Sequence, residues 1–314
     1  MTMTSLIYDD IYLKHDTGAN HPENAMRIKN TIEYLRSASI WQKLDLKKPR
    51  AATIEEVSTV HTINQIEEVA EIAKAGGGYL DPDTHVSPDS YEAALYASGA
   101  LLTAIDLVMD KKTDNAFCLV RPPGHHSTPA KAMGFCLFNN VAIAAKYIQS
   151  EYNLDRVAII DWDVHHGNGT QDAFYDDPSV LYFSMHKYPF YPGTGAKEET
   201  GEGSGSGFTI NIPLSYNIEP MEYLEIFDEI LKKRVKSFNP QFVLISSGFD
   251  AYRLDPISGL SLEASDFNAL TKLTRNIAND CCEGRIVSCL EGGYHLLDLP
   301  KCIEAHLDGL VCDI

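Results

Sequence analysis

Residues 159–170 (Ile-Ile-Asp-Trp-Asp-Val-His-His-Gly-Asn-Gly-Thr) combine residue types that bind metal ions in proteins. Asp161, Asp163 and His165 stand at alternate positions, and alternate side chains of an extended segment share one face. Two carboxylates and an imidazole on one face would be stabilised by a cation. A single Asp-x-His is more often a strand end whose side chains make structural hydrogen bonds, so this stretch needs support from elsewhere in the chain.

A third ligand follows residues 242–249, an apolar stretch that ends directly before Asp250. Asp163, His165 and Asp250 would provide three protein ligands and leave a fourth position for water or substrate, as a catalytic zinc site requires. Mixed oxygen and nitrogen ligands suit zinc better than magnesium or calcium. We therefore expect one Zn²⁺ per chain, with iron(II) or cobalt as alternatives.

Residues 121–126 (Arg-Pro-Pro-Gly-His-His) could supply a general base beside this metal. The prolines stiffen the loop and aim the adjacent side chains of His125 and His126. One histidine would take a proton from water and the other would help the leaving amine depart. Each ring needs an acceptor that orients its other nitrogen, and Asp161 and Asn168 are the candidates.

Residues 290–294 (Leu-Glu-Gly-Gly-Tyr) could supply an oxyanion donor. Tandem glycines allow positive φ and a close approach of the backbone, which would swing Tyr294 over a site. A hydroxyl aimed at a reacting carbonyl typically contributes ~3 kcal/mol to transition-state stabilisation. The alternative is a tyrosine that packs beside a tight turn.

Alternating helices and strands are expected to position these residues. Hydrophobic spacing predicts helices at residues 21–37, 62–75, 88–109, 139–149, 220–237, 262–282 and 300–311. Continuous apolar runs predict buried strands at residues 116–120, 156–161, 180–184, 208–213, 242–247 and 285–290. The alternation predicts an α/β fold with a central, mostly parallel sheet and helices on both faces. Ligands of such folds bind beyond the carboxyl ends of the strands, where all four stretches would meet.

Composition restricts the class of protein. A length of 314 residues with 44% hydrophobic and 22% charged residues suits a globular protein, and we expect one domain over residues 1–314. The net charge of −18 argues against nucleic-acid binding and favours cationic substrates. Seven scattered cysteines indicate reduced thiols. We recognise neither a membrane span nor a signal peptide and expect a cytoplasmic location.

Together the stretches resemble the zinc-dependent histone deacetylase family, which has the arginase/deacetylase fold. The matching segments are residues 121–126, 133–145, 161–171, 184–195, 248–256 and 291–294, with weaker similarity at 21–23 and 81–84. Asn168 and the segment 133–145 look closer to class II and bacterial members. The resemblance implies Asp163, His165 and Asp250 as zinc ligands, His126 as general base, His125 as its electrostatic partner and Tyr294 as oxyanion donor.

The resemblance also implies secondary sites. Phe135 and Tyr191 match the aromatic walls of a substrate tunnel, Gly134 matches a carbonyl that receives the substrate amide, and Asp83 matches a rim carboxylate, with Asp81 as a rival. Ile257 stands where polyamine-selective relatives can carry a glutamate. The family carries potassium sites. The inner set here would be Asp161 with main-chain groups of Asp163, His165, Ser184 and Met185, and the outer set would be main-chain groups of Phe174, Asp177, Val180 and Phe208.

These features favour a hydrolase that removes acetyl or related acyl groups from lysine side chains of a protein or peptide. An acetylpolyamine or other small-amide hydrolase would share the catalytic residues. A binuclear manganese hydrolase of the arginase type would need further acidic ligands, whereas residues 164–166 are Val-His-His. A non-enzymatic acyl-lysine binder is the remaining alternative. The oligomeric state is left open by the sequence.

Overall fold

The computed structural model describes residues 2–257 and 259–311. Their strands are β1 (Thr4–Ile7), β2 (Leu44–Lys47), β3 (Gly78–Asp81), β4 (Thr84–Val86), β5 (Asn115–Cys118), β6 (Val157–Asp161), β7 (Val180–Lys187), β8 (Thr209–Leu214), β9 (Phe242–Ser247) and β10 (Ile286–Leu290). The α-helices are α1 (Met26–Ser37), α2 (Ile54–Val57), α3 (Ile63–Lys74), α4 (Ser90–Met109), α5 (Asn140–Tyr152), α6 (Asn168–Ala173), α7 (Pro220–Ile230), α8 (Lys236–Phe238), α9 (Ala264–Cys282) and α10 (Leu299–Val311). Short 3-10 or π turns are η1 (Asp10–Lys14), η2 (Ser39–Lys43), η3 (Gly203–Gly205) and η4 (Leu231–Val235).

Eight strands form one sheet in the order β2-β1-β5-β10-β9-β6-β7-β8, and every neighbouring pair is parallel. The expectation of a mostly parallel sheet is confirmed. The strands that precede the predicted site residues, β5, β10, β9 and β6, are the four adjacent strands at its centre. Their carboxyl ends therefore meet at one edge. A separate antiparallel hairpin is formed by β3 and β4.

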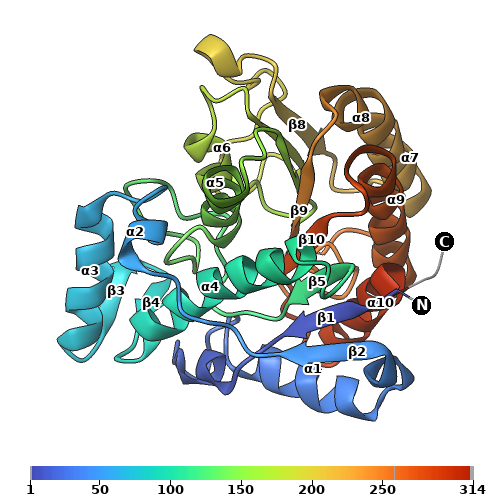
Figure 1. Cartoon of the computed structure of the whole chain (residues 1–314). Coiled ribbons are helices and arrows are strands. Elements are labelled where there is room, and N and C mark those ends of the chain that lie inside the picture. Colours follow the sequence, from blue (N-terminus) through green and yellow to red (C-terminus); the bar gives the residue numbers. More distant parts are fainter. Residues whose placement is uncertain (1, 258, 312–314) are drawn as a thin grey trace.

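Helices cover both faces of the sheet, as predicted (Figure 1). On one face α4 packs against β1, β5 and β10, and α5 packs against β6 and β9. On the other, α9 contacts β9, α10 contacts β5, and α1 and α7 pack against these two helices. The hairpin lies beside α3 at the side of the molecule (Figure 1). The sheet is thus shielded from water on both sides, which explains the unbroken apolar runs of its strands.

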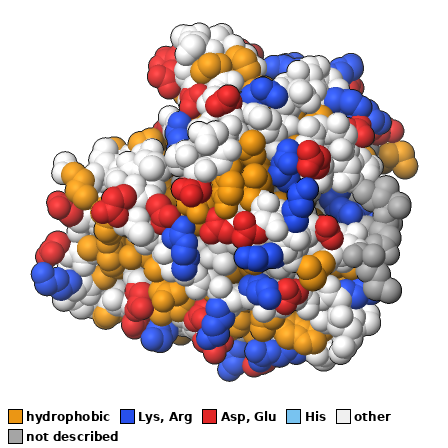
Figure 2. Space-filling model, in the orientation of Figure 1, with side chains coloured by type: hydrophobic (Ala, Val, Ile, Leu, Met, Phe, Trp, Pro, Cys, Tyr) orange, Lys and Arg blue, Asp and Glu red, His pale blue; other side chains and the backbone are white. Residues whose placement is uncertain are grey.

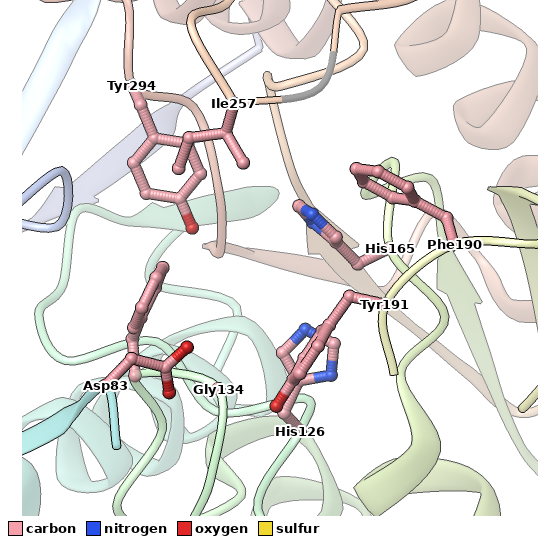
Figure 3. Close-up of a pocket in the computed structure, with 9 residues that line it drawn as sticks. Asp83, His126, Gly134, His165, Phe190, Tyr191, Ile257 and Tyr294 are labelled. Atoms are coloured by element: carbon pink, nitrogen blue, oxygen red, sulfur yellow. The ribbon is translucent and has the colours of Figure 1, made fainter. Parts of the chain in front are cut away.

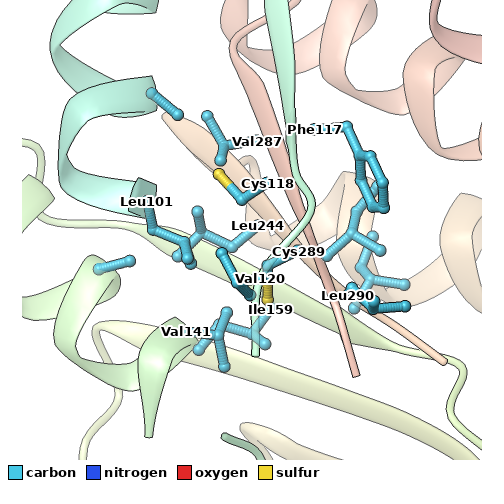
Figure 4. Packing of buried hydrophobic residues seen from close by; sticks show 14 of the residues in the cluster. Leu101, Phe117, Cys118, Val120, Val141, Ile159, Leu244, Val287, Cys289 and Leu290 are labelled. Carbon is cyan, nitrogen blue, oxygen red and sulfur yellow. The ribbon is translucent and has the colours of Figure 1, made fainter. Parts of the chain in front are cut away.

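The core forms where the central strands meet these helices. Leu101 of α4 and Val141 of α5 pack over Ile159, Leu244 and Val287, and all five are at most 1% exposed (Figure 4). Burying each such side chain contributes about 1.5–3 kcal/mol, so the central strands that carry the site are also the best anchored.

Helix α4 is long and apolar enough to cross a membrane by length and composition alone. The sequence analysis predicted a helix at residues 88–109 but recognised no stretch of sufficient length and apolar character to span a membrane. Most of the helix is buried in the protein, where it contacts α5 and β5. Its apolar character is accounted for by this position in the core.

Several predicted boundaries were wrong for local reasons. The helix predicted from residue 21 begins at Met26, because Asn24 holds a turn in which its amide donates to His21 O and its Oδ1 accepts from Met26 N. The helix predicted over residues 220–237 is interrupted by the π turn η4. Strands β1 and β2 and the β3–β4 hairpin were not predicted, because runs of three or four residues show too little periodicity.

One face of the molecule mixes both signs of charge. Figure 2 shows Lys and Arg side chains interspersed with Asp and Glu on one face.

A buried ion cluster joins the first helix to the sheet. Glu23, Arg27 and Arg121 are at most 1% exposed. The Glu23 carboxylate accepts from Arg27 Nη1 at 2.9 Å and from Arg121 Nη2 at 2.8 Å. Burial alone would raise the pKa of Glu23, but the charge and hydrogen bonds of Arg121, with Arg27, hold it well below its usual range. One carboxylate thus compensates two buried guanidinium groups.

Glu23→Gln should destabilise the fold by about 3–5 kcal/mol, because both arginines then stay buried without a counter-charge. Urea unfolding at pH 7 measures the change. Asp228→Asn, which breaks the exposed pair with Lys232, is the control and should cost less than about 1 kcal/mol. Since the pKa of Glu23 is lowered on folding, its stabilisation is present above the unfolded pKa, and the difference from wild type should shrink below about pH 4. A loss no larger than that of the control would contradict the role of the cluster.

Candidate active site

Asp163, His165 and Asp250 converge at the carboxyl edge of the sheet. One ligand atom from each lies within 4.8 Å of the others, and all three residues are buried. His165 Nδ1 is 3.1 Å from Asp163 Oδ1 and 3.1 Å from Asp250 Oδ2. The predicted ligand set is therefore brought together by the loops that follow β6 and β9.

Strand alternation does not produce this arrangement, because β6 ends at Asp161. Side chains hold the next residues instead. Asp161 Oδ1 accepts from Asp163 N at 3.1 Å, and Asp163 Oδ1 accepts from His165 N at 2.9 Å. In each case an Asp side chain accepts from the backbone N–H two residues further on, which forms a turn. Two such turns in succession replace the extended segment expected from the sequence.

Gly292 closes the carboxylate side of the site. Its N–H donates to Asp163 Oδ2 at 2.8 Å. A Cβ at this position would stand 2.2 Å from Asp250 Oδ2 and 2.5 Å from Asp163 Oδ2. Only glycine leaves room for both carboxylates here.

The electrostatics of this group suit a bound divalent cation. Burial, then the neighbouring Asp163, raises the pKa of Asp250. Burial opposes a charge on His165, yet hydrogen bonds to Asp163 and Asp250 raise its pKa to about 9. Buried carboxylates are costly unless a cation compensates them, and two oxygens and one nitrogen form a donor set that a catalytic zinc site uses. The residues present therefore fit a metal centre.

The two adjacent histidines are held by different partners, as predicted. His125 Nδ1 lies 3.0 Å from Asp161 Oδ2, whereas His126 Nδ1 lies 2.9 Å from Asn168 Oδ1. Burial opposes a charge on His125, but Asp163 and Asp161 raise its pKa to about 10. Burial and the positive charges of His125 and His165 lower the pKa of His126. His126 is thus the neutral member of the pair.

The tautomer of His126 follows from its partner. An amide Oδ1 only accepts hydrogen bonds, so Nδ1 of His126 carries the hydrogen and donates to Asn168. Nε2 is left with its lone pair, and the ring lines the pocket. This is the arrangement that a general base requires.

Tyr294 stands on the opposite wall of the pocket, and its hydroxyl points into the open space in Figure 3. Of the two preceding glycines only Gly293 has a positive φ, of 117°, so the expectation for tandem glycines holds for one of them. Tyr294 N donates to Asp255 Oδ2 at 2.7 Å, and the Arg27 guanidinium lies 4.8 Å from its ring centroid. Burial raises the pKa of Tyr294, so the hydroxyl keeps its proton as a donor.

A cavity of about 190 Å³ leads to this chemistry. Its lining is Asp83, His126, Gly134, Phe135, His165, Phe190, Tyr191, Ile257 and Tyr294. All five residues predicted to contact substrate are therefore at the pocket (Figure 3). Between the two rim candidates, Asp83 lines the cavity, whereas Asp81 Oδ1 accepts from the backbone N–H groups of Asp83 and Thr84.

Sequence reasoning missed two residues of the site. The Phe190 ring stacks on His165 with centroids 5.2 Å apart and 19° between planes, and its place directly before Tyr191 was the available signal. The carboxylate of Glu291 accepts from the N–H groups of Gly124 and His125. Glu291 belongs to the stretch quoted for Tyr294, but nothing in that stretch shows what a carboxylate would contact.

Some residues of the predicted potassium sets lie near one another. Asp161 lies beside Ser184 in the register of β6 and β7. In the outer set Phe174 O accepts from Asp177 N at 3.1 Å, and Phe208 O accepts from Tyr182 N at 2.9 Å. The roles of these residues, and of Met185 and Val180, stay predictions.

Comparisons with known proteins agree with this fold and site. The profile of the histone deacetylase domain matches residues 21–310. A probable deacetylase from Archaeoglobus fulgidus is 40% identical over 294 residues, covering 93% of this chain and 81% of the relative. A histone deacetylase-like amidohydrolase from Pseudomonas aeruginosa is 37% identical over 293 residues, covering 93% of this chain and 76% of the relative.

Structural similarity is equally extensive. The crystal structure of the HDA15 HD domain superposes with a TM-score of 0.94 at 34% identity, covering 99% of this chain and 88% of that one. The fold and site define an α/β protein with a buried Asp-His-Asp metal centre at the edge of a parallel sheet. The chain belongs to the histone deacetylase family.

Asp250→Asn should lower the zinc content of the purified protein by at least about tenfold, because one anionic ligand is lost. In wild type, zinc at 100 times its Kd should stabilise the fold by ~2.7 kcal/mol. Without metal the variant should be at least as stable as wild type, since one of two repelling carboxylates is gone. Metal analysis and thermal unfolding with and without chelator measure both effects. Asp280→Asn, at an exposed carboxylate paired with Lys236, is the control, and equal zinc contents in the two variants would refute the ligand assignment.

Proposed function

We propose that this protein is a zinc-dependent amidohydrolase that removes acetyl or related acyl groups from the ε-amine of lysine. The observation that carries the proposal is the cavity, which reaches His126, His165 and Tyr294 between aromatic walls. An extended methylene chain with an amide at its end suits such a cavity. The names of the two relatives, a probable deacetylase and a histone deacetylase-like amidohydrolase, support the same reaction class.

Asp163, His165 and Asp250 would hold the zinc ion. When bound, the ion supplies Lewis-acid activation of water and of the amide carbonyl. His126 accepts the proton of the attacking water at Nε2, because its Nδ1 donates to Asn168. Tyr294 donates a hydrogen bond to the oxyanion that develops on the carbonyl oxygen.

His125 would support the proton transfer through its charge. Its contact with Asp161 and the nearby Asp163 favour the imidazolium form, which adds positive charge beside the developing oxyanion and keeps the neighbouring His126 neutral. A histidine of this pair returns the proton to the departing amine. The reaction then needs no covalent intermediate with the protein.

Phe135 and Tyr191 are suited to hold the lysine methylenes. Their rings contact the catalytic residues directly. Phe135 lies 6.0 Å from the Tyr294 ring at 85°, and Tyr191 lies 5.0 Å from the His126 ring at 88°. Substrate between them would exclude water from the reacting groups.

The alternative, an acetylpolyamine hydrolase, has one supporting observation. Asp83 lines the cavity, and a carboxylate there could attract the second amine of a polyamine. Burial and hydrogen bonding with Asp81 raise the pKa of Asp83 to about 6, so it is mainly ionised at pH 7. Ile257, at another side of the same cavity (Figure 3), offers no charge, and this favours the lysine substrate.

An acetyl-lysine peptide should exceed N-acetylputrescine in kcat/KM by at least about tenfold, equivalent to 1.4 kcal/mol. Steady-state kinetics with both substrates on the zinc-loaded enzyme measure the ratio. A ratio in favour of N-acetylputrescine would make the polyamine function the correct one. An absence of turnover on both substrates would refute an amidohydrolase of either kind.

Tyr294→Phe should lower kcat by about 10²–10³-fold, because one oxyanion donor is removed. Zinc content should stay at the wild-type level, since the hydroxyl is not among the metal ligands. Tyr223→Phe removes a buried hydroxyl that lies outside the pocket lining, and it controls for the loss of a phenolic oxygen. Turnover within about threefold of wild type in Tyr294→Phe would contradict the assigned role.

A further inference from the structure

Glu291 follows β10 directly, and its side chain is fully buried. It does not line the cavity. Its carboxylate nevertheless accepts four hydrogen bonds. Oε2 accepts from Gly124 N at 2.7 Å and from His125 N at 3.2 Å, and Oε1 accepts from Ser246 Oγ at 3.0 Å and from Cys289 Sγ at 3.6 Å.

The two carboxylate oxygens of Glu291 contact different parts of the structure. Oε1 is held by Ser246 of β9 and Cys289 of β10, two neighbouring strands at the centre of the sheet. Oε2 holds the loop after β5, the strand on the other side of β10. The carboxylate therefore ties the loop of the tandem histidines to two central strands of the sheet.

The main chain of Glu291 is anchored as well. Arg27 Nη2 donates to Glu291 O at 2.6 Å, and Glu291 N donates to Ser247 O at 3.1 Å. Because its backbone is held on both sides, the carboxylate has a defined position relative to the strands. The position of the carboxylate is therefore set by the strands and by Arg27, and not by the loop that it holds.

Burial raises the pKa of Glu291, whereas the nearby His125 and the hydrogen bond from Gly124 N favour its ionised form. Two adjacent backbone N–H groups point at one oxygen, and hydrogen bonds to a charged acceptor are shorter and stronger than those to a neutral one. Without the carboxylate, both buried N–H groups would lose their acceptor, at a cost of about 1–3 kcal/mol each. The loop would then relax away from its present place.

We propose that Glu291 is a positioning residue that sets the distance of His125 and His126 from the reacting amide. The role rests on the amide hydrolysis proposed above. The side chains of the two histidines are oriented by Asp161 and Asn168, whereas Glu291 places their backbone. A displacement of about 1 Å in such a loop can cost 10²-fold in rate.

Glu291→Ala should lower kcat on the acetyl-lysine peptide at least about 100-fold and leave KM within about threefold, because Phe135 and Tyr191, which would hold the lysine methylenes, are untouched. Glu291→Gln should recover kcat to within about tenfold of wild type. Its amide oxygen can accept from Gly124 and His125, and its NH₂ group can donate to Ser246 Oγ. Zinc content should match wild type in both variants.

Hydrogen–deuterium exchange gives a readout that does not depend on turnover. The amides of Gly124 and His125 should exchange faster in Glu291→Ala and stay protected in Glu291→Gln. Glu56→Ala is the matched control, because Glu56 also accepts from a backbone N–H, that of Thr53, far from the site. It should lower stability while kcat and the exchange of the histidine loop stay as in wild type.

Three results would overturn the proposal: a kcat of Glu291→Ala within threefold of wild type, unchanged exchange at the two amides, or a Gln variant as impaired as the Ala variant. If Glu291→Ala does not fold, Glu291→Asp replaces it, since a carboxylate one methylene shorter cannot span the same contacts. An inactive wild-type enzyme would instead refute the proposed function. The exchange experiment would still show whether Glu291 holds the loop of His125 and His126.

Discussion

The interaction on which the site depends is the repulsion between two carboxylates that the fold buries side by side. Asp163 and Asp250 are fully buried at the carboxyl edge of the sheet. Neighbouring groups reduce the cost, since Gly292 N and His165 N donate to Asp163, and Val164 N donates to Asp250. These contacts fix the geometry but do not remove two negative charges, and a divalent cation does so. The charge balance of the site therefore depends jointly on the cation, on its ligands and on the N–H groups that donate to these ligands.

The residues around the metal ligands favour different protonation states of His125 and His126. His125, in contact with Asp161, is favoured in the protonated form, and this makes a second charge on His126 unfavourable. The neutral amide of Asn168 then orients His126, and burial and the charges of His125 and His165 lower the pKa of His126 by more than this hydrogen bond raises it. Two histidines with adjacent positions in the chain thus acquire different protonation states from two different partners. Because Glu291 holds the loop that carries both histidines, each ring stays within hydrogen-bonding distance of its acceptor.

Much of this architecture was predictable because it follows from local patterns. The apolar runs before Asp161, Asp250 and Glu291 indicated buried parallel strands, and the carboxyl-edge rule then placed the polar residues together. The need of each histidine ring for an acceptor indicated Asp161 and Asn168 as the partners, and the structure assigned Asp161 to His125 and Asn168 to His126. The short strands β1 and β2 escaped prediction, because their pairings, β2 with β1 and β1 with β5, are contacts between distant segments that leave little periodicity in four residues. The start of α1 at Met26 depended on the side chain of Asn24, which sequence spacing did not reveal.

The amino-acid sequence alone was sufficient for the α/β class and for gathering the three metal-binding side chains, the two adjacent histidines and Tyr294 at one site, because this depends on residue type and on position after a strand. It was not sufficient for contacts between loops. That Asp83 rather than Asp81 faces the cavity, that Phe190 stacks on His165, and that Glu291 holds the histidine loop all depend on where separate segments lie in space. The Asp-His-Asp group that the residue types predicted is confirmed as a buried cluster, and it owes its geometry to turns made by its own carboxylates rather than to the pleat of a strand.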